Sequence, residues 1–145
     1  MLIADQDAGK DKKHQRLTSQ QHAGFEYIVT PTREIENLLK PEVIVGALKK
    51  LYPKQAEYFD ATQLKQAQYK SIYLAKHLKS KFAELPDSFG GSSGSGTVSS
   101  AKKRLFAEAA AEAITSWDML SPEAQELTKR VFQFIMGHNP RLGSN

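Results

Sequence analysis

The sequence predicts a mixed α/β fold that is mostly α by residue count, with two short strands and about five helices. Two short apolar or β-branched runs near the N-terminus are typical of strands. Apolar side chains at three- and four-residue spacing predict helices over most of the remaining chain. The length of 145 residues, 40% of them apolar, allows one domain or part of one to bury a core without disulfides or a structural metal.

The composition excludes several classes of protein. The chain contains no cysteine, which rules out a disulfide framework, a zinc–thiolate site and a cysteine nucleophile. No apolar run approaches the roughly 20 residues that span a bilayer, and the first residues lack the basic and apolar regions of a secretory signal. We therefore expect a cytoplasmic protein. The net charge of +4 admits a polyanionic partner but lacks the concentrated excess of a dedicated nucleic-acid-binding domain.

The two expected strands lie within the first 30 residues. Residues 1–4 form an apolar run that ends at two aspartates, Asp5 and Asp7. Residues 10–21 are polar and basic and predict a loop or an exposed helix. Residues 25–29 are β-branched and aromatic and stop at Pro31, which is typical of a strand.

Three helices are expected next. Thr32 is placed to cap a short helix over residues 33–39, which should end before Pro41. Pro41 can open a second helix, which should stop near Pro53. Residues 56–85 form the longest helical candidate. Its small and apolar side chains recur at helical spacing, at Leu64, Ala67, Ser71, Leu74, Leu78, Phe82 and Leu85.

A Gly/Ser-rich linker over residues 89–99 divides the chain into an N-terminal segment (1–88) and a two-helix C-terminal segment (100–145) that should pack on the first. The linker composition favours an engineered join over a natural loop. An alanine-rich helix over 100–117 should follow. Its buried face comprises Phe106, Ala110, Ala113, Ile114 and Trp117. The last helix should be capped by Ser121 and end at Gly137. Its buried face comprises Ala124, Leu127, Val131, Phe134 and Ile135.

Two acidic motifs are the first candidates for chemistry. Asp5 and Asp7 lie where the first strand ends, so both carboxylates can turn toward one hard divalent cation. On this spacing alone, a polar turn that closes the strand is the favoured interpretation. Glu34 and Glu36 share one helical turn and can face a site, although acidic residues also favour any helix N-terminus.

A basic cluster, Lys102, Lys103 and Arg104, lies at the start of an expected helix. Cations are slightly unfavourable there because of the helix dipole, which makes the cluster a candidate phosphate contact. The charge alone favours a solvated basic face. The four histidines, His14, His22, His77 and His138, have no metal-ligand spacing.

The order of these motifs resembles the second half of a Toprim domain, and most closely that of the OLD family of ATP-dependent overcoming-lysogenization nucleases. The matching features are Leu-Ile-Ala-Asp-Gln-Asp at residues 2–7, a following strand, and Arg-Glu-Ile-Glu-Asn-Leu-Leu at residues 33–39 with Pro-Glu after it. Lys103 and Ala107 match a later helix that opens with a lysine and an alanine four positions on. The resemblance covers about residues 1 to 115.

This resemblance implies metal-dependent cleavage of DNA phosphodiesters, with a role in bacterial antiphage defence. Asp5 and Asp7 would bind Mg²⁺ or Mn²⁺, with Glu34 and Glu36 as further candidate ligands. Lys103 would be the catalytic residue, whose ammonium offsets the negative charge on the scissile phosphate in the transition state. The residues expected to position the DNA backbone are Lys10, Lys12, Lys13, Arg16 and Lys102.

The chain departs from the family in two respects. It has neither the upstream glutamate of a Toprim domain nor the Walker motif of the ATPase half. We therefore expect a piece of the enzyme, or the product of a split gene, whose partner carries the missing parts; a homo-oligomer stays open. Two other functions also stay open. One is a helical protein-interaction module, which an exposed apolar patch on the 64–85 helix would favour. The other is a non-catalytic nucleic-acid-binding domain.

Overall fold

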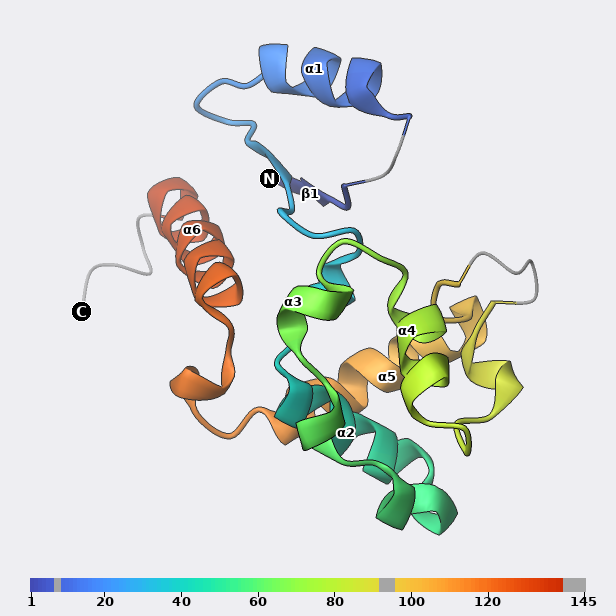
Figure 1. Ribbon diagram of the computed structural model, residues 1–145. Coiled ribbons are helices and arrows are strands. Elements are labelled where there is room, and N and C mark those ends of the chain that lie inside the picture. The colour runs from blue at the N-terminus through green and yellow to red at the C-terminus, as the bar shows by residue number, and fades with distance from the viewer. Residues whose placement is uncertain (7–8, 92–95, 140–145) are drawn as a thin grey trace.

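The computed structural model describes residues 1–6, 9–91 and 96–139, in which helices predominate over a single small sheet (Figure 1). Strands β1 (Leu2–Ala4) and β2 (Tyr27–Val29) pair in parallel, with Leu2 opposite Tyr27 and Ala4 opposite Val29. This confirms the predicted α/β class and both predicted strands. Parallel strands need a crossover connection, and helix α1 (Asp11–Ser19) provides it.

Helix α1 confirms the exposed-helix interpretation of the polar N-terminal stretch. None of its residues is buried. It is joined to the sheet by a hydrogen bond of 2.6 Å between His14 Nδ1 and the Tyr27 hydroxyl, with the two rings stacked. Figure 1 shows α1 at the end of the molecule remote from α2 and α5.

The segment after β2 differs from the prediction in its capping. Thr32 is not the helix cap: its hydroxyl donates to the Glu34 carbonyl oxygen at 2.8 Å, which turns the chain before any helix begins. The helical part is a short 3₁₀ helix, η1 (Ile35–Leu38), with Glu34 in the capping position. Its tight winding suits a single turn between two extended residues.

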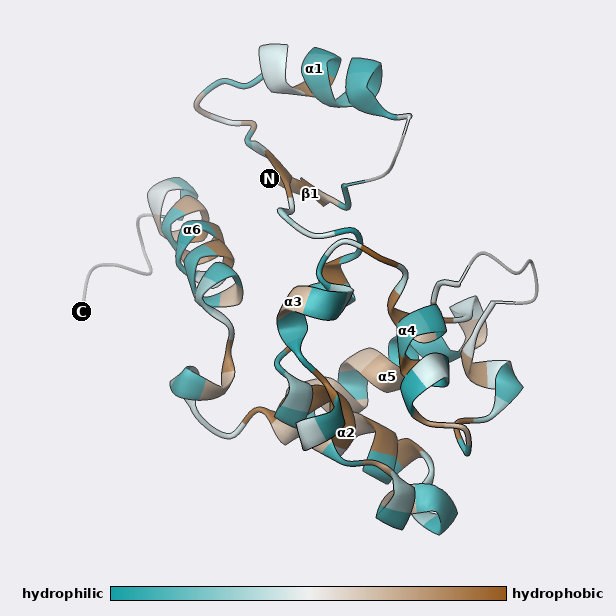
Figure 2. Cartoon of the chain, viewed as in Figure 1, coloured by the Kyte–Doolittle hydropathy of each residue, from teal (hydrophilic) through white to brown (hydrophobic). Residues whose placement is uncertain are grey.

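The hydrophobic core forms where α2 (Pro41–Leu51) packs on α5 (Ser100–Ala113). The predicted start of α2 at Pro41 and its end before Pro53 are confirmed. Gly46 lets the two helices approach closely, because a Cβ at this position would lie 3.0 Å from the Ala113 Cβ. Figure 2 shows apolar residues along both α2 and α5. The fully buried large side chains around it include Ile44, Leu48, Phe59, Phe82, Phe89 and Phe106.

The long helix predicted over residues 56–85 is wrong. The segment instead contains η2 (Pro53–Tyr58), η3 (Ala61–Gln63), α3 (Gln66–Tyr69) and α4 (Leu74–Lys81). Its predicted apolar positions Leu64, Leu74, Leu78 and Leu85 are nevertheless buried. Asn37 Nδ2 donates to the carbonyl oxygens of Tyr69 and Ile72, and these hydrogen bonds stabilise the turn that separates α3 from α4.

The ends of the Gly/Ser-rich segment belong to the core. Phe89, at the end of η4 (Asp87–Phe89), and Val98 are both buried. Gly90 and Val98 form an antiparallel bridge, and Phe89 packs edge-on against Phe106 of α5. The Gly/Ser-rich residues 92–95 lie outside the described residues.

The C-terminal elements are less buried than predicted. Helix α5 ends at Ala113, so Trp117 leaves the predicted face and lies in η5 (Trp117–Met119), 48% exposed. Helix α6 (Pro122–His138) has the predicted cap, because Ser121 Oγ accepts a hydrogen bond of 3.1 Å from the Ala124 amide. No residue of α6 is fully buried. The predicted face is half-buried at Ala124, Leu127, Val131 and Phe134, whereas Ile135 is exposed. Figure 1 shows α6 standing beside the rest of the chain.

A search of the described residues for a helix long and apolar enough to cross a membrane found none.

Candidate functional site

Acidic side chains from two distant segments meet at the C-terminal end of β1. Asp5 directly follows β1, and its Oδ1 accepts a hydrogen bond of 2.8 Å from the Ile35 amide. The parallel pairing of β1 and β2 accounts for this meeting, because it brings the carboxyl ends of both strands to one edge. A backbone hydrogen bond also joins the two segments, because the Gln6 amide donates to the Thr32 carbonyl oxygen at 3.3 Å.

Glu34 is a structural member of this cluster. It is only 4% exposed, and its Oε2 accepts a hydrogen bond of 2.8 Å from the Leu74 amide at the start of α4. Its own amide donates to Asn37 Oδ1 at 2.9 Å. Glu34 therefore satisfies an amide that the first turn of α4 leaves without a partner, and Asn37 fixes the backbone of Glu34.

Burial and the neighbouring charged groups shift the pKa of the Glu34 carboxyl. Burial raises the pKa of the Glu34 carboxyl above its ordinary value, and the hydrogen bond from Leu74 opposes this shift. The negative charge of Glu36 raises the pKa further, the Lys103 ammonium lowers it, and Asp5 raises it. We call Asp5, Glu34, Glu36 and Lys103 the carboxylate cluster, because Asp5 accepts from the amide that follows Glu34 and Lys103 lies beside Glu36.

Glu36 and Lys103 face each other in this cluster. Lys103 Nζ on α5 lies 3.6 Å from Glu36 Oε1, and the Glu36 side chain is 14% exposed. Glu36 Oε2 is buried and has no hydrogen-bond partner within the described part of the chain. A buried carboxylate oxygen without a donor is costly, so this oxygen is the atom of the cluster best suited to receive a ligand.

The carboxylate oxygens of this cluster are ligands that a hard divalent cation prefers. The described residues do not supply a full set of such ligands. Within residues 1–6, 9–91 and 96–139, no three His, Cys, Asp or Glu side chains are grouped so as to hold a metal ion. Asp7, the second carboxylate of the N-terminal motif, lies outside the described residues. Mg²⁺ is commonly held by one or two carboxylates and keeps several waters, so Asp5 and Glu36 are the candidate ligands among the described residues.

The predicted nucleic-acid contacts are spread over the molecule. Lys10, Lys12, Lys13 and Arg16 are exposed on or beside α1. Lys102 lies on α5, where its Nζ is 5.9 Å from the centre of the Tyr52 ring. Lys102 therefore turns toward α2, whereas Lys103 turns toward the carboxylate cluster. The neighbour Arg104 pairs with Glu108 at 3.6 Å.

Sequence reasoning missed the role of Asn37, although Asn37 is part of the matching motif. Its side chain bonds the Glu34 amide and two carbonyl oxygens of the α3–α4 turn. A buried amide that forms several hydrogen bonds specifies the local backbone. The only signal in the sequence was an amide side chain on the same turn as two acids. The two carbonyl oxygens that accept from Asn37 lie more than 30 residues away in the sequence.

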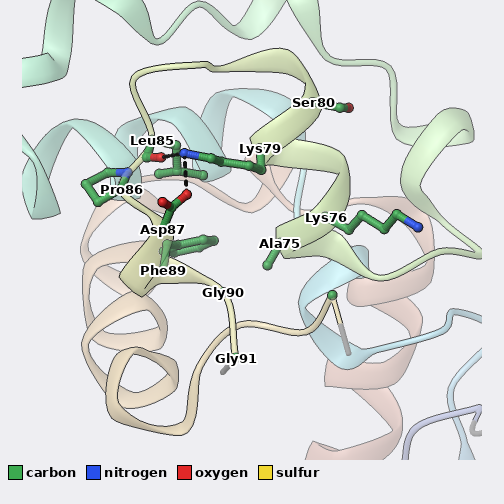
Figure 3. A pocket seen from close by; sticks show the side chains of 11 residues that line it. Ala75, Lys76, Lys79, Ser80, Leu85, Pro86, Asp87, Phe89, Gly90 and Gly91 are labelled. Carbon is green, nitrogen blue, oxygen red and sulfur yellow. Dashed lines mark hydrogen bonds and ion pairs between the residues drawn. The ribbon is translucent and has the colours of Figure 1, made fainter. Parts of the chain in front are cut away.

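A separate cavity of about 470 Å³ lies between α4 and η4 (Figure 3). Lys79 crosses it, with Nζ 2.9 Å from Asp87 Oδ1 and hydrogen-bonded to the Leu85 carbonyl oxygen. The Lys79 ammonium is therefore already occupied, and Lys76 and Ser80 are further polar residues of this lining.

Comparisons with protein-family models, with curated proteins and with solved structures found no match to this chain. A functional assignment therefore depends on the residues of the carboxylate cluster and their geometry.

Proposed function

We propose that this chain is the C-terminal portion of a divalent-metal-dependent, Toprim-like nuclease that cleaves DNA phosphodiesters. The supporting observation is the carboxylate cluster itself. Its members come from positions 5, 34, 36 and 103, and they are the residues that the resemblance to the OLD family singled out. Because positions 5, 34 and 103 are far apart in the sequence, only the tertiary fold brings them together.

Asp5 and Glu36 are the proposed ligands, through the Asp5 oxygen that Ile35 does not occupy and the unpartnered Glu36 Oε2. Asp7 follows the same strand and would complete the set. When bound, Mg²⁺ or Mn²⁺ would supply an activated water and stabilise the leaving oxygen. Glu34 would hold α4 and the 33–38 segment in place through its bond to Leu74, rather than bind the ion.

Lys103 is the proposed phosphate-facing charge. Its pairing with Glu36 keeps the ammonium beside the ligand oxygens. An ammonium held there offsets the negative charge that develops on a scissile phosphate, and does so without reorganisation at the moment of reaction. The upstream glutamate and the ATPase half would come from the rest of the enzyme or from a partner chain.

The decisive experiment is a Mn²⁺ titration of the ¹⁵N-labelled chain, because paramagnetic Mn²⁺ broadens the amide signals near its site. We expect broadening centred on Asp5, Asp7 and residues 33–37, and its loss in Asp5→Asn and Glu36→Gln. Glu57→Gln, at an exposed acid on η2, is the matched control. Broadening scattered over surface acids and unchanged in Asp5→Asn would refute the proposal.

A second candidate function, a protein-interaction module, is favoured by a different observation. The 64–85 segment buries Leu64, Leu74, Leu78, Phe82 and Leu85 and exposes Ile72 as its one large apolar side chain, so these positions do not form the apolar patch that would favour this function. Helix α6 instead presents Phe132 and Ile135, which are 61% and 43% exposed. If α6 is the functional surface, Phe132→Ser will abolish partner capture and leave Mn²⁺ broadening unchanged.

A further inference from the structure

A second cavity, of about 540 Å³, lies between the Arg33 side chain and the segment that leads into α4. We call it the basic cavity, because no acidic side chain lines it. Four of its lining residues carry a cationic, imidazole or phenol group, and two carry an aliphatic hydroxyl. They are Arg33, Tyr73, Lys76, His77, Ser71 and Ser80.

Arg33 is held rigidly without loss of its charge. Its guanidinium carbon lies 4.4 Å from the centre of the Tyr73 ring, and its Nη2 donates to the Tyr73 hydroxyl. Its backbone amide donates to the Lys70 carbonyl oxygen at 3.0 Å. A guanidinium fixed by stacking loses little entropy when it binds an anion. No ion pair joins Arg33 or Lys76 to a carboxylate within the described ranges.

His77 adds a buried polar group that lacks a partner. It is 8% exposed, and its Nε2 forms no hydrogen bond with any residue that the structure describes. Burial, and then the charge of Lys81, lower the pKa of the His77 imidazole. The ring is therefore neutral near pH 7 and can carry its proton on Nε2, where it would donate to an anion. Because His77 lines the cavity, an anion bound there is a candidate partner for this buried group.

From these observations we infer that the basic cavity binds a phosphate group, either of a nucleic-acid strand or of a free phosphate compound. The planar guanidinium of Arg33 suits two phosphate oxygens, and Lys76 supplies a second positive charge. This site needs no metal ion and is separate from the carboxylate cluster. It goes beyond the proposed function, because it holds whether or not the cluster cleaves DNA.

The test is a titration of the ¹⁵N-labelled chain with inorganic phosphate in EDTA, following the amides of residue 33 and residues 71–80. We expect saturable shifts. Arg33→Gln and Lys76→Gln should each weaken binding by about tenfold, the loss of one charge-assisted hydrogen bond. Lys54→Gln, at an exposed lysine on η2, removes the same charge elsewhere and should change affinity less than about twofold.

Two of the variants, Lys76→Gln and the additional Arg33→Lys, distinguish a lost phosphate contact from misfolding. Lys76 is exposed, so Lys76→Gln leaves the packing intact. Arg33→Lys keeps the charge but loses the planar fork, so it should bind phosphate more weakly than the native chain and more tightly than Arg33→Gln. Shifts that fail to saturate, or that are the same in Lys76→Gln and Lys54→Gln, would overturn the inference.

The source of the phosphate is decided by repeating the titration with thymidine 5′-monophosphate and with a short oligothymidylate. Tighter binding of the oligonucleotide, lost in Lys76→Gln, would assign the cavity to a strand. Tighter binding of the monophosphate would assign it to a free phosphate compound. The carboxylate cluster is checked separately with Asp5→Asn, which should leave phosphate binding unchanged. Phosphate binding with no Mn²⁺ site would therefore remove the nuclease proposal and keep this one.

Discussion

The buried carboxylate of Glu34 provides the sharpest test of how the site is built. Glu34→Ala removes the acceptor for the Leu74 amide and leaves that buried donor without a partner. We expect a loss of about 1–3 kcal/mol in the free energy of unfolding, the usual cost of an unsatisfied buried donor. Glu34→Gln keeps an oxygen at the same position, so it should retain most of this stability.

The two variants also predict a pH dependence. Because the folded-state pKa of Glu34 is raised above its unfolded value, the native chain loses stability as pH rises from about 4.5 through that folded pKa. Glu34→Gln cannot titrate, so its stability relative to the native chain should increase over the same window.

Urea unfolding followed by circular dichroism at a series of pH values measures both effects. Glu84→Ala, at an exposed glutamate, is the control and should stay within about 0.5 kcal/mol of the native chain. Two results would refute the reasoning: Glu34→Ala as stable as the control, or Glu34→Gln as unstable as Glu34→Ala. Glu34→Gln should also keep Mn²⁺ broadening, because the carboxylate is assigned to α4 rather than to the ion.

Three further predictions concern other parts of the chain. Asp7→Ala should abolish Mn²⁺ broadening while the dispersion of the amide spectrum stays native, and retained binding would remove Asp7 from the site. Gly46→Leu should destabilise the chain by about 1–3 kcal/mol in urea, since its Cβ would meet Ala113 at 3.0 Å; an unchanged midpoint would mean that α2 and α5 separate easily. His77, whose folded pKa is lowered by burial and by Lys81, should make the native chain lose stability as pH falls below about 6.5. His77→Gln should flatten that slope in thermal melts, and an unaltered slope would assign it to another group.

Local signals in the sequence predicted the elements whose formation depends on neighbouring residues. Pro41 opens α2 because its fixed backbone suits the first helical position. Ser121 caps α6 because its hydroxyl reaches the amide three residues on. The apolar positions of residues 64–85 were identified as buried, yet their helix was not continuous. Periodicity reports which side chains face the core, but it does not report competition for backbone carbonyls by a distant residue such as Asn37.

The candidate site was likewise predicted in part from the sequence and in part only from the structure. The sequence identified Asp5, Glu34, Glu36 and Lys103 individually, and the resemblance placed them in one order. It could not separate the roles of Glu34 and Glu36, because both lie on one short turn. The structure suggests the division: Glu34 turns inward to cap α4, and Glu36 turns toward Lys103.

Local sequence patterns specify the α/β class, both strands, the exposed character of α1 and the limits of α2. These features depend on side-chain polarity, proline geometry and spacing within a few residues. Long-range contacts specify which acid faces Lys103, where the 56–85 segment breaks, and that Arg33 and His77 line one cavity. Those outcomes depend on contacts between segments tens of residues apart. Their free energy comes from burial and hydrogen bonding in the folded chain, which no local pattern encodes.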